Sequence, residues 1–197
     1  MTQHDLENKT DEQIFHLVQE GEIKAFEVLY QRYSRRLLHF LIRLLNGDES
    51  RAQDLLQDVF LRVLEKRNLF RDKHRFSTWI FTITHNICKN EYRSVAGRME
   101  INFTDSEFIN ALSLDSTPSE IEKIDQEYFR RRLLHLIQAV SPDQRNTFLL
   151  RYQENLPVHE IAIIMNCSEG TVKSRLHYTL GKIAEQLNVY DPNKSEV

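Results

Sequence analysis

Residues 158–177, VHEIAIIMNCSEGTVKSRLH, contain the pattern that decides the fold of this chain. Apolar residues recur at helical spacing on both sides of a short polar stretch, which predicts two helices joined by a tight turn. Asn166 is expected in that turn because asparagine tolerates a left-handed backbone better than most residues do. A helix-turn-helix of this kind is typical of DNA-binding proteins, and a plain helical hairpin with solvated charges is the competing interpretation.

The second helix of the pair is expected to present polar and basic side chains to DNA. Ser168 should cap its N-terminus, and the following residues lie around its exposed side. In a major groove these side chains would face bases or phosphates. The candidate contacts of this recognition helix are Ser168, Thr171, Lys173, Ser174, Arg175, His177 and Tyr178.

Composition favours a soluble, mostly helical protein. Of 197 residues, 41% are hydrophobic and 28% are charged, and only five are Gly and four are Pro. Cys88 and Cys167 lie far apart without a CxxC pair, so neither a disulfide nor a metal site is predicted, and no cofactor is expected. No stretch approaches the roughly 18 apolar residues of a membrane span. The expectation is a cytoplasmic protein without membrane insertion.

The formal charge of −3 hides strong local differences. Residues 67–98 contain seven Lys or Arg against two acids, a net of +5. Residues 99–127 contain eight acids against one lysine, and residues 128–189 carry a net of +3. Because nucleic-acid binding depends on where positive charge is presented, two basic regions flanking an acidic connector are compatible with DNA binding.

Apolar spacings of three and four residues predict an all-α fold of two small helical domains. Helical patterns run up to Gly21, up to Asn46, over 49–67 and on to about Arg93, and they resume at Phe129 after a stretch where periodicity fades. Thr10 and Ser141 each open a capping box. The predicted organisation is an N-terminal domain at 10–95, an acidic flexible linker at 96–125 and a C-terminal domain at 126–188 that contains the helix-turn-helix.

Two further surfaces of the N-terminal domain are candidate partner sites, and for each the competing interpretation is an ordinary amphipathic helix, with an incidental surface leucine in the first case and a half-buried aromatic edge in the second. The helix at 49–67 has an apolar stripe for the core, and its opposite face combines acids and amides with one leucine: Gln53, Asp54, Gln57, Asp58 and Leu61. The segment 70–93 interleaves aromatic and basic residues, which suits unpaired DNA because rings stack on bases while cations follow phosphates. Its candidate contacts are Arg71, Lys73, His74, Arg75, Trp79, His85, Asn86, Lys89 and Arg93, with Phe81 and Tyr92 in the same aromatic row.

An ordered set of motifs resembles one family over most of 22–187. SPDQRNTFLLRYQENLPVHEIAIIMNCSEGTVKSRLHYTLGKI resembles the C-terminal domain of bacterial RNA polymerase sigma factors, particularly the extracytoplasmic-function (ECF) group. AFEVLYQRY, RAQDLLQDVFLRVLEK and FSTWIFTITHNICKNEYR resemble its N-terminal domain, in the same order.

The resemblance implies a specificity subunit that directs RNA polymerase to promoters and catalyses nothing itself. The 49–67 helix would dock on core RNA polymerase, the 70–93 segment would open the minus-ten element of promoter DNA and capture a flipped base, and the recognition helix would read the minus-thirty-five element. For Arg175, a phosphate contact and packing against its own domain are both open alternatives. The resemblance also implies an anti-sigma protein as a partner and a linker that threads toward the polymerase cleft. Thr82, His85, His177 and Tyr178 depart from the commoner residues of the family, so no relative's promoter sequence is transferred.

Two other functions compete with this interpretation. A stand-alone two-domain transcription regulator would share the helix-turn-helix, but it would carry a ligand or phosphorylation domain in front, and no alternating strand-helix pattern indicates one. A helical adaptor without a DNA role would leave the basic loop without a purpose. No phosphate-binding loop, nucleophile elbow or HExxH motif indicates an enzyme.

Overall fold

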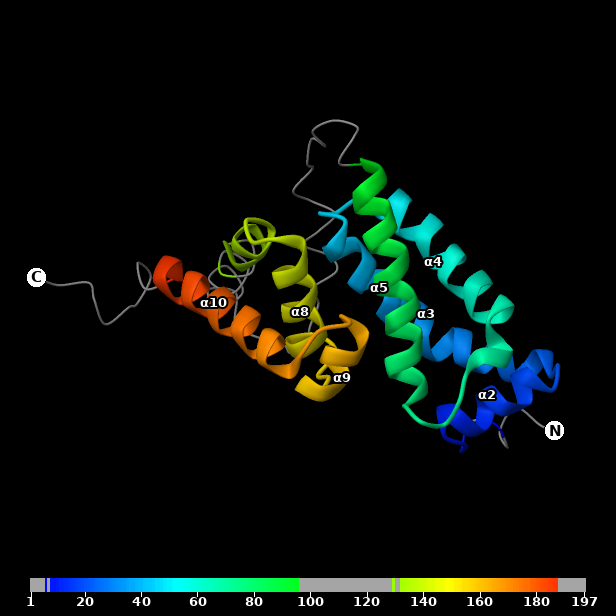
Figure 1. Ribbon diagram of the computed structural model, residues 1–197. Coiled ribbons are helices and arrows are strands. Elements are labelled where there is room, and N and C mark those ends of the chain that lie inside the picture. Colours follow the sequence, from blue (N-terminus) through cyan, green and yellow to red (C-terminus); the bar gives the residue numbers. More distant parts are fainter. Residues whose placement is uncertain (1–5, 7, 96–128, 130–131, 188–197) are drawn as a thin grey trace, which may run out of the picture. The chain divides into compact units, whose positions relative to one another are not determined.

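The computed structural model describes residues 6, 8–95, 129 and 132–187 (Figure 1). The acidic linker predicted at 96–125 lies outside the described residues. Every regular element in the described ranges is a helix, which confirms the all-α prediction. We describe residues 8–95 as the N-terminal body and residues 132–187 as the C-terminal body.

The N-terminal body consists of α2 (Asp11–Gln19), α3 (Ile23–Leu44), α4 (Glu49–Glu65), the short 3-10 helix η1 (Arg67–Leu69) and α5 (Phe76–Val95). Helix α2 begins with the predicted capping box, in which Thr10 and Gln13 exchange backbone and side-chain hydrogen bonds. Helix α3 ends where Asn46 and Gly47 adopt positive φ values of 59° and 92°. That left-handed turn lets α4 return along α3, and the Asp48 side chain caps α4.

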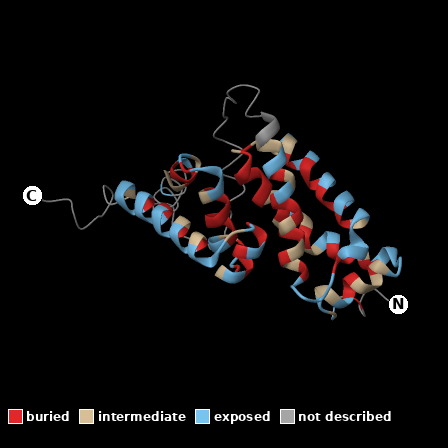
Figure 2. Cartoon of the chain, in the orientation of Figure 1, coloured by how far each residue is buried: buried red, intermediate tan, exposed pale blue. Residues whose placement is uncertain are grey.

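Each α-helix of this body buries one stripe and exposes another, as Figure 2 shows for α4. The stripe of α3 at Leu29, Leu37 and Phe40 is at most 1% exposed, and it packs against the buried stripe of α4. Polar contacts join the helices at their ends. Arg51 of α4 donates two hydrogen bonds to the Glu91 carboxylate of α5, at 2.8 and 2.7 Å.

The C-terminal body contains helical residues 132–138, α8 (Pro142–Tyr152), α9 (Val158–Ile164) and α10 (Glu169–Leu187). Helix α8 begins with the predicted capping box between Ser141 and Gln144. The core of the C-terminal body joins Ile137, Phe148 and Ile183, which come from three helical segments. The buried Arg145 guanidinium donates to the carbonyls of Ile137 and Gln138, at 3.2 and 2.6 Å, and so fixes residues 132–138 to α8.

The predicted helix-turn-helix is formed by α9 and α10. Asn166 lies in the turn with a φ of 49°, the left-handed conformation expected for it. Ile161 and Val172 are fully buried, and Met165 and Leu176 are at most 8% exposed, so the four residues make the predicted core of the pair.

Candidate nucleic-acid interface

The first turn of α10 is built by the predicted cap. The Ser168 hydroxyl accepts a hydrogen bond from the Thr171 backbone N–H at 3.1 Å, and the two hydroxyls lie 2.9 Å apart. These contacts satisfy one of the N–H groups that a helix N-terminus leaves without a partner. Ser168 and Thr171 therefore cap the N-terminus of the recognition helix, and they also lie near its exposed side.

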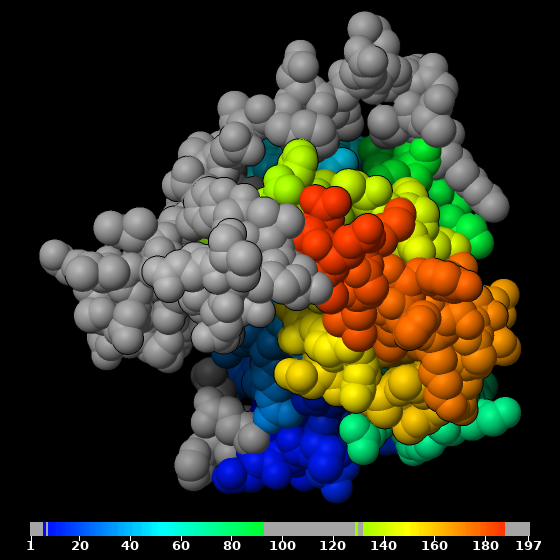
Figure 3. All heavy atoms as spheres, turned by 90° about the vertical axis from the view of Figure 1, so that its left-hand side faces the viewer, coloured from blue at the N-terminus to red at the C-terminus, as the bar shows by residue number. Residues whose placement is uncertain are grey.

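Four of the predicted contacts share the exposed side of α10. The buried side consists of Val172, Leu176, Thr179 and Ile183. The opposite side presents Lys173, Ser174, His177 and Tyr178, all of which are exposed. Figure 3 shows the surface of α10, in orange and red, turned toward the viewer. A cation, a hydroxyl, an imidazole and a phenol on one helix face are groups that can bind phosphates and base edges.

Arg175 lies differently from its neighbours. Its guanidinium is directed back onto its own domain, where it donates to the Asp143 carboxylate of α8 and approaches the Cys167 sulfur at 3.8 Å. Only 22% of the side chain is exposed. Of the two alternatives for Arg175, the structure favours packing within the C-terminal body. The pair links α10 to α8 beside their shared core.

In the N-terminal body the predicted basic loop is pinned at both ends. Phe70 and Phe76 are at most 2% exposed, and the five residues between them are all exposed. We call residues 71–75 the cationic loop. Arg71 folds back and donates to the carbonyls of Asn68 and Phe70, at 2.7 and 2.9 Å. Lys73, His74 and Arg75 are presented at the surface, as predicted.

An aromatic cluster holds the two ends of the cationic loop. The ring of Phe15 from α2 lies 4.8–5.1 Å, centroid to centroid, from those of Phe70, Phe76 and Trp79. Trp79 is half-buried and also contacts the Phe70 ring at 5.4 Å. Trp79 was predicted as a DNA contact, and in the structure its main contacts are within this cluster. Its packing positions the loop.

Polar side chains of α2 also contact the cationic loop and its flanks, which sequence analysis missed. They are Glu12, His16 and Gln19. The hydrogen bonds to Asp72 and Gln19 raise the pKa of His16 above its usual value. The three residues follow each other at spacings of four and three, so one helix face carries them all. From the sequence, that spacing of polar residues could have predicted a second face of α2 that contacts another segment of the chain.

The aromatic row expected on the outer side of α5 is largely part of the fold. Phe81 is fully buried, with its ring centroid 5.2 Å from that of Phe40, and the Arg36 guanidinium lies over the Phe81 ring. Tyr92 donates to the Leu44 carbonyl. His85, which lies between them in the same row, is 6% exposed. This corrects the expectation that the row forms an open stacking surface, because its rings close the body against α3.

Two predicted contacts on α5 remain on its surface. Asn86 and Lys89 are exposed, on the same face at a spacing of three residues. Arg93 belongs to α5, and its side chain lies outside the described residues.

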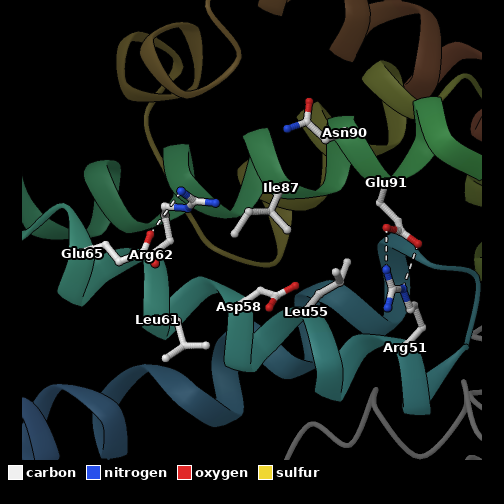
Figure 4. Close-up of a pocket in the computed structure, with 9 residues that line it drawn as sticks. All are labelled: Arg51, Leu55, Asp58, Leu61, Arg62, Glu65, Ile87, Asn90 and Glu91. Atoms are coloured by element: carbon white, nitrogen blue, oxygen red, sulfur yellow. Dashed lines mark hydrogen bonds and ion pairs between the residues drawn. The ribbon is translucent and has the colours of Figure 1, made fainter.

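The residues of α4 that were predicted to form a docking face lie at the surface. Gln53, Asp54, Gln57 and Asp58 are exposed, and Leu61 is 59% exposed among them. A groove of about 440 Å³ runs between α4 and α5 next to this face (Figure 4). Its ends carry the ion pairs Arg51–Glu91 and Arg62–Glu65, and hydrogen bonding by Arg51 lowers the pKa of Glu91.

The two cysteines lie in different environments. Cys88 is 1% exposed, and burial raises the pKa of its thiol to about 12, so the nucleophilic thiolate is suppressed. Cys167 is half-buried in the turn before α10. Within the described ranges no cluster of three or more His, Cys, Asp or Glu residues could hold a metal ion. None of the helices found there is long and apolar enough to cross a bilayer.

Comparisons with known proteins match both bodies. Residues 29–98 match the family described as Sigma-70 region 2, and residues 130–183 match Sigma-70, region 4. The chain is 30% identical to the RNA polymerase sigma-H factor of Pseudomonas aeruginosa, over 87% of this chain and 90% of that protein. It is 31% identical to the ECF RNA polymerase sigma-E factor of Escherichia coli, over 86% and 90% of the two chains.

Two solved structures share the fold. One is the sigma factor RpoE in complex with the anti-sigma factor NepR from Bartonella quintana, with a TM-score of 0.62 and 23% identity over 85% of this chain and 99% of that one. The other is CnrH in complex with the cytosolic domain of CnrY, with a TM-score of 0.67 and 18% identity over 92% and 99% of the chains.

Proposed function

Because this chain belongs to the ECF sigma factors, which direct bacterial RNA polymerase in transcription initiation, we propose how its surfaces divide that work. The exposed side of α10 reads the minus-thirty-five element as duplex DNA. The cationic loop, with Asn86 and Lys89, binds the minus-ten element as its strands separate. The α4 face docks on core polymerase.

The observation that carries this proposal is that each body presents its own cationic surface on a rigid support. In the C-terminal body, Lys173 and its three polar neighbours lie on a helix that packs on α8 through a buried core and is also linked to it by the Arg175–Asp143 pair. In the N-terminal body, the cationic loop lies between two buried phenylalanines. A helix suits the major groove of a duplex, whereas an exposed cationic loop suits the phosphates of a strand that has left the duplex.

The net charge explains why the protein would act within a larger assembly. With a formal charge of −3, the free chain lacks the overall attraction to phosphate that stand-alone DNA-binding proteins use. Core polymerase supplies further positive surface and sets the separation of the two bodies. In this role the protein catalyses nothing itself and acts in the cytoplasm, where the polymerase works.

The α4 face has the chemistry of a docking surface for a basic partner helix. One leucine that is 59% exposed stands among two carboxylates and two amides. Interfaces commonly combine such an apolar anchor with a polar rim. Since both solved structures described above are complexes, one with an anti-sigma factor and one with the cytosolic domain of CnrY, we include an anti-sigma protein as a second partner that holds the chain inactive.

A stand-alone regulator is not favoured, because residues 29–98 match a sigma-factor region and not a ligand or phosphorylation domain.

The proposed division of work is tested by selection from a random-sequence duplex library with the reconstituted holoenzyme. The wild type should enrich two motifs. Lys173→Ala should erase the upstream motif alone, and Lys73→Ala should weaken the downstream one alone. Loss of both motifs in either variant, or of neither, would overturn the assignment.

A further inference from the structure

The polar face of α2 contacts the cationic loop at its two ends and near its middle. At the C-terminal end, Glu12 Oε1 accepts the backbone N–H of Phe76 at 2.8 Å. Phe76 is the first residue of α5, where N–H groups have no partner within the helix. Glu12 therefore caps α5 from a different helix, 64 residues away in sequence.

At the N-terminal end of the loop, the Gln19 amide donates to the carbonyls of Arg67 and Phe70, at 2.7 and 3.5 Å. Near its middle, His16 Nε2 lies 2.9 and 3.0 Å from the two carboxylate oxygens of Asp72. His16 Nδ1 is 2.8 Å from Gln19 Oε1, so the two side chains also orient each other.

Apolar packing reinforces these polar contacts. Phe15, on the same helix, is fully buried against Phe70 and Phe76, the residues on either side of the loop. Contacts from elements distant in sequence hold both the loop and its flanks: most come from α2, and the Tyr33 ring of α3 lies 5.3 Å, centroid to centroid, from that of Phe76. The conformation of the loop thus depends on a helix far away in sequence.

We propose that α2 is the frame that preorganises the cationic loop for capture of unpaired promoter DNA, and that Glu12, His16 and Gln19 are positioning residues for strand opening. This inference rests on the role proposed above for the loop. None of the three side chains needs to touch DNA. They hold Lys73, His74 and Arg75 in one arrangement before DNA arrives, which lowers the entropy lost when the loop binds.

The exposure of the contacts supports a positioning role over a purely stabilising one. His16 and Asp72 are 45% and 61% exposed, and an ion pair of that kind contributes little to global stability. Its effect is local, since it orders one exposed segment. The raised pKa of His16 is consistent with an imidazolium that bonds to both partners.

The test uses the full-length protein in the reconstituted holoenzyme. The probe is a single-stranded oligonucleotide that carries the downstream motif selected by the wild type, together with versions in which each base is replaced. Glu12→Ala and His16→Asn should weaken binding about tenfold and reduce the discrimination between bases. Glu12→Gln keeps the acceptor oxygen and should restore binding to within about twofold of the wild type. Core binding should be unchanged.

Gln13→Ala is the matched control, because Gln13 lies on α2 and closes its capping box without contacting the loop. Wild-type binding and base discrimination in Glu12→Ala and His16→Asn would overturn the inference. So would equal losses in Gln13→Ala and Glu12→Ala, because the effect would then follow from the stability of α2. If Lys73→Ala also binds the probe as tightly as the wild type, the proposed function of the loop itself fails.

Discussion

Leu61→Ala should weaken the binding of core polymerase while leaving the folded protein intact. Leu61 is 59% exposed on α4 and is surrounded by polar side chains of the docking face. Leu61 is not among the buried residues of α4 that face the core. The substitution therefore removes an apolar anchor from the proposed interface without opening a cavity in the fold.

The size of the effect follows from the area that docking would cover. Complete burial of a leucine side chain contributes about 1.5–3 kcal/mol. Since 59% of Leu61 is exposed before docking, its burial in an interface would contribute about 1–2 kcal/mol. The dissociation constant of the complex with core polymerase should therefore rise about five- to thirtyfold.

Fluorescence anisotropy with labelled protein and purified core polymerase measures this constant directly. Leu69→Ala is the matched control, because Leu69 is 67% exposed in the same body but lies on η1, away from the docking face. The midpoint of thermal unfolding should shift little in either variant. If Leu61→Ala binds core polymerase as tightly as Leu69→Ala does, the assignment of the docking face is wrong.

Three other perturbations follow from the structure. Asp143→Asn should release Arg175 from α8, so the affinity of the holoenzyme for non-promoter duplex should depend more steeply on salt, by about one unit of logarithmic slope; an unchanged slope in a salt titration would contradict the restraining role of Asp143. Phe15→Ala should lower the free energy of unfolding of the N-terminal body by about 3–5 kcal/mol in chemical denaturation, because its fully buried ring joins both flanks of the loop, and a loss below 1 kcal/mol would refute that packing. The pKa of His16 is raised above 6.5 in the fold, so the small stabilisation from its bond to Asp72 is fully present below pH 6.5 and is lost as the pH rises through the folded-state pKa. The thermal midpoint of the wild type should therefore exceed that of His16→Asn most at pH 6 and least at pH 9, and a difference that grows with pH would be the contrary result.

Local sequence signals predicted the helices and their ends. The capping boxes at Thr10 and Ser141 and the left-handed Asn166 are formed as expected, since each depends on residues within a few positions of one another. The exposed side of the recognition helix was predicted for the same reason: helical spacing assigns residues to faces.

Contacts between distant residues could not be predicted in this way. His16 meets Asp72 across 56 positions, and Arg175 meets Asp143 across 32. Spacing on α5 placed Phe81 correctly in a row with other aromatic residues. It did not indicate that α3 would cover that row, because periodicity assigns residues to one face of a helix but does not predict which other element packs against that face.

The division of promoter recognition between the two bodies is tested most directly by transcription in vitro. Purified core polymerase and the full-length chain are incubated with a pool of genomic fragments, and the transcript starts are sequenced. The account predicts discrete starts that share two upstream motifs, require the chain, and are lost with Lys173→Ala and with Lys73→Ala. Starts that do not depend on the chain, or that both variants support as well as the wild type does, would contradict it.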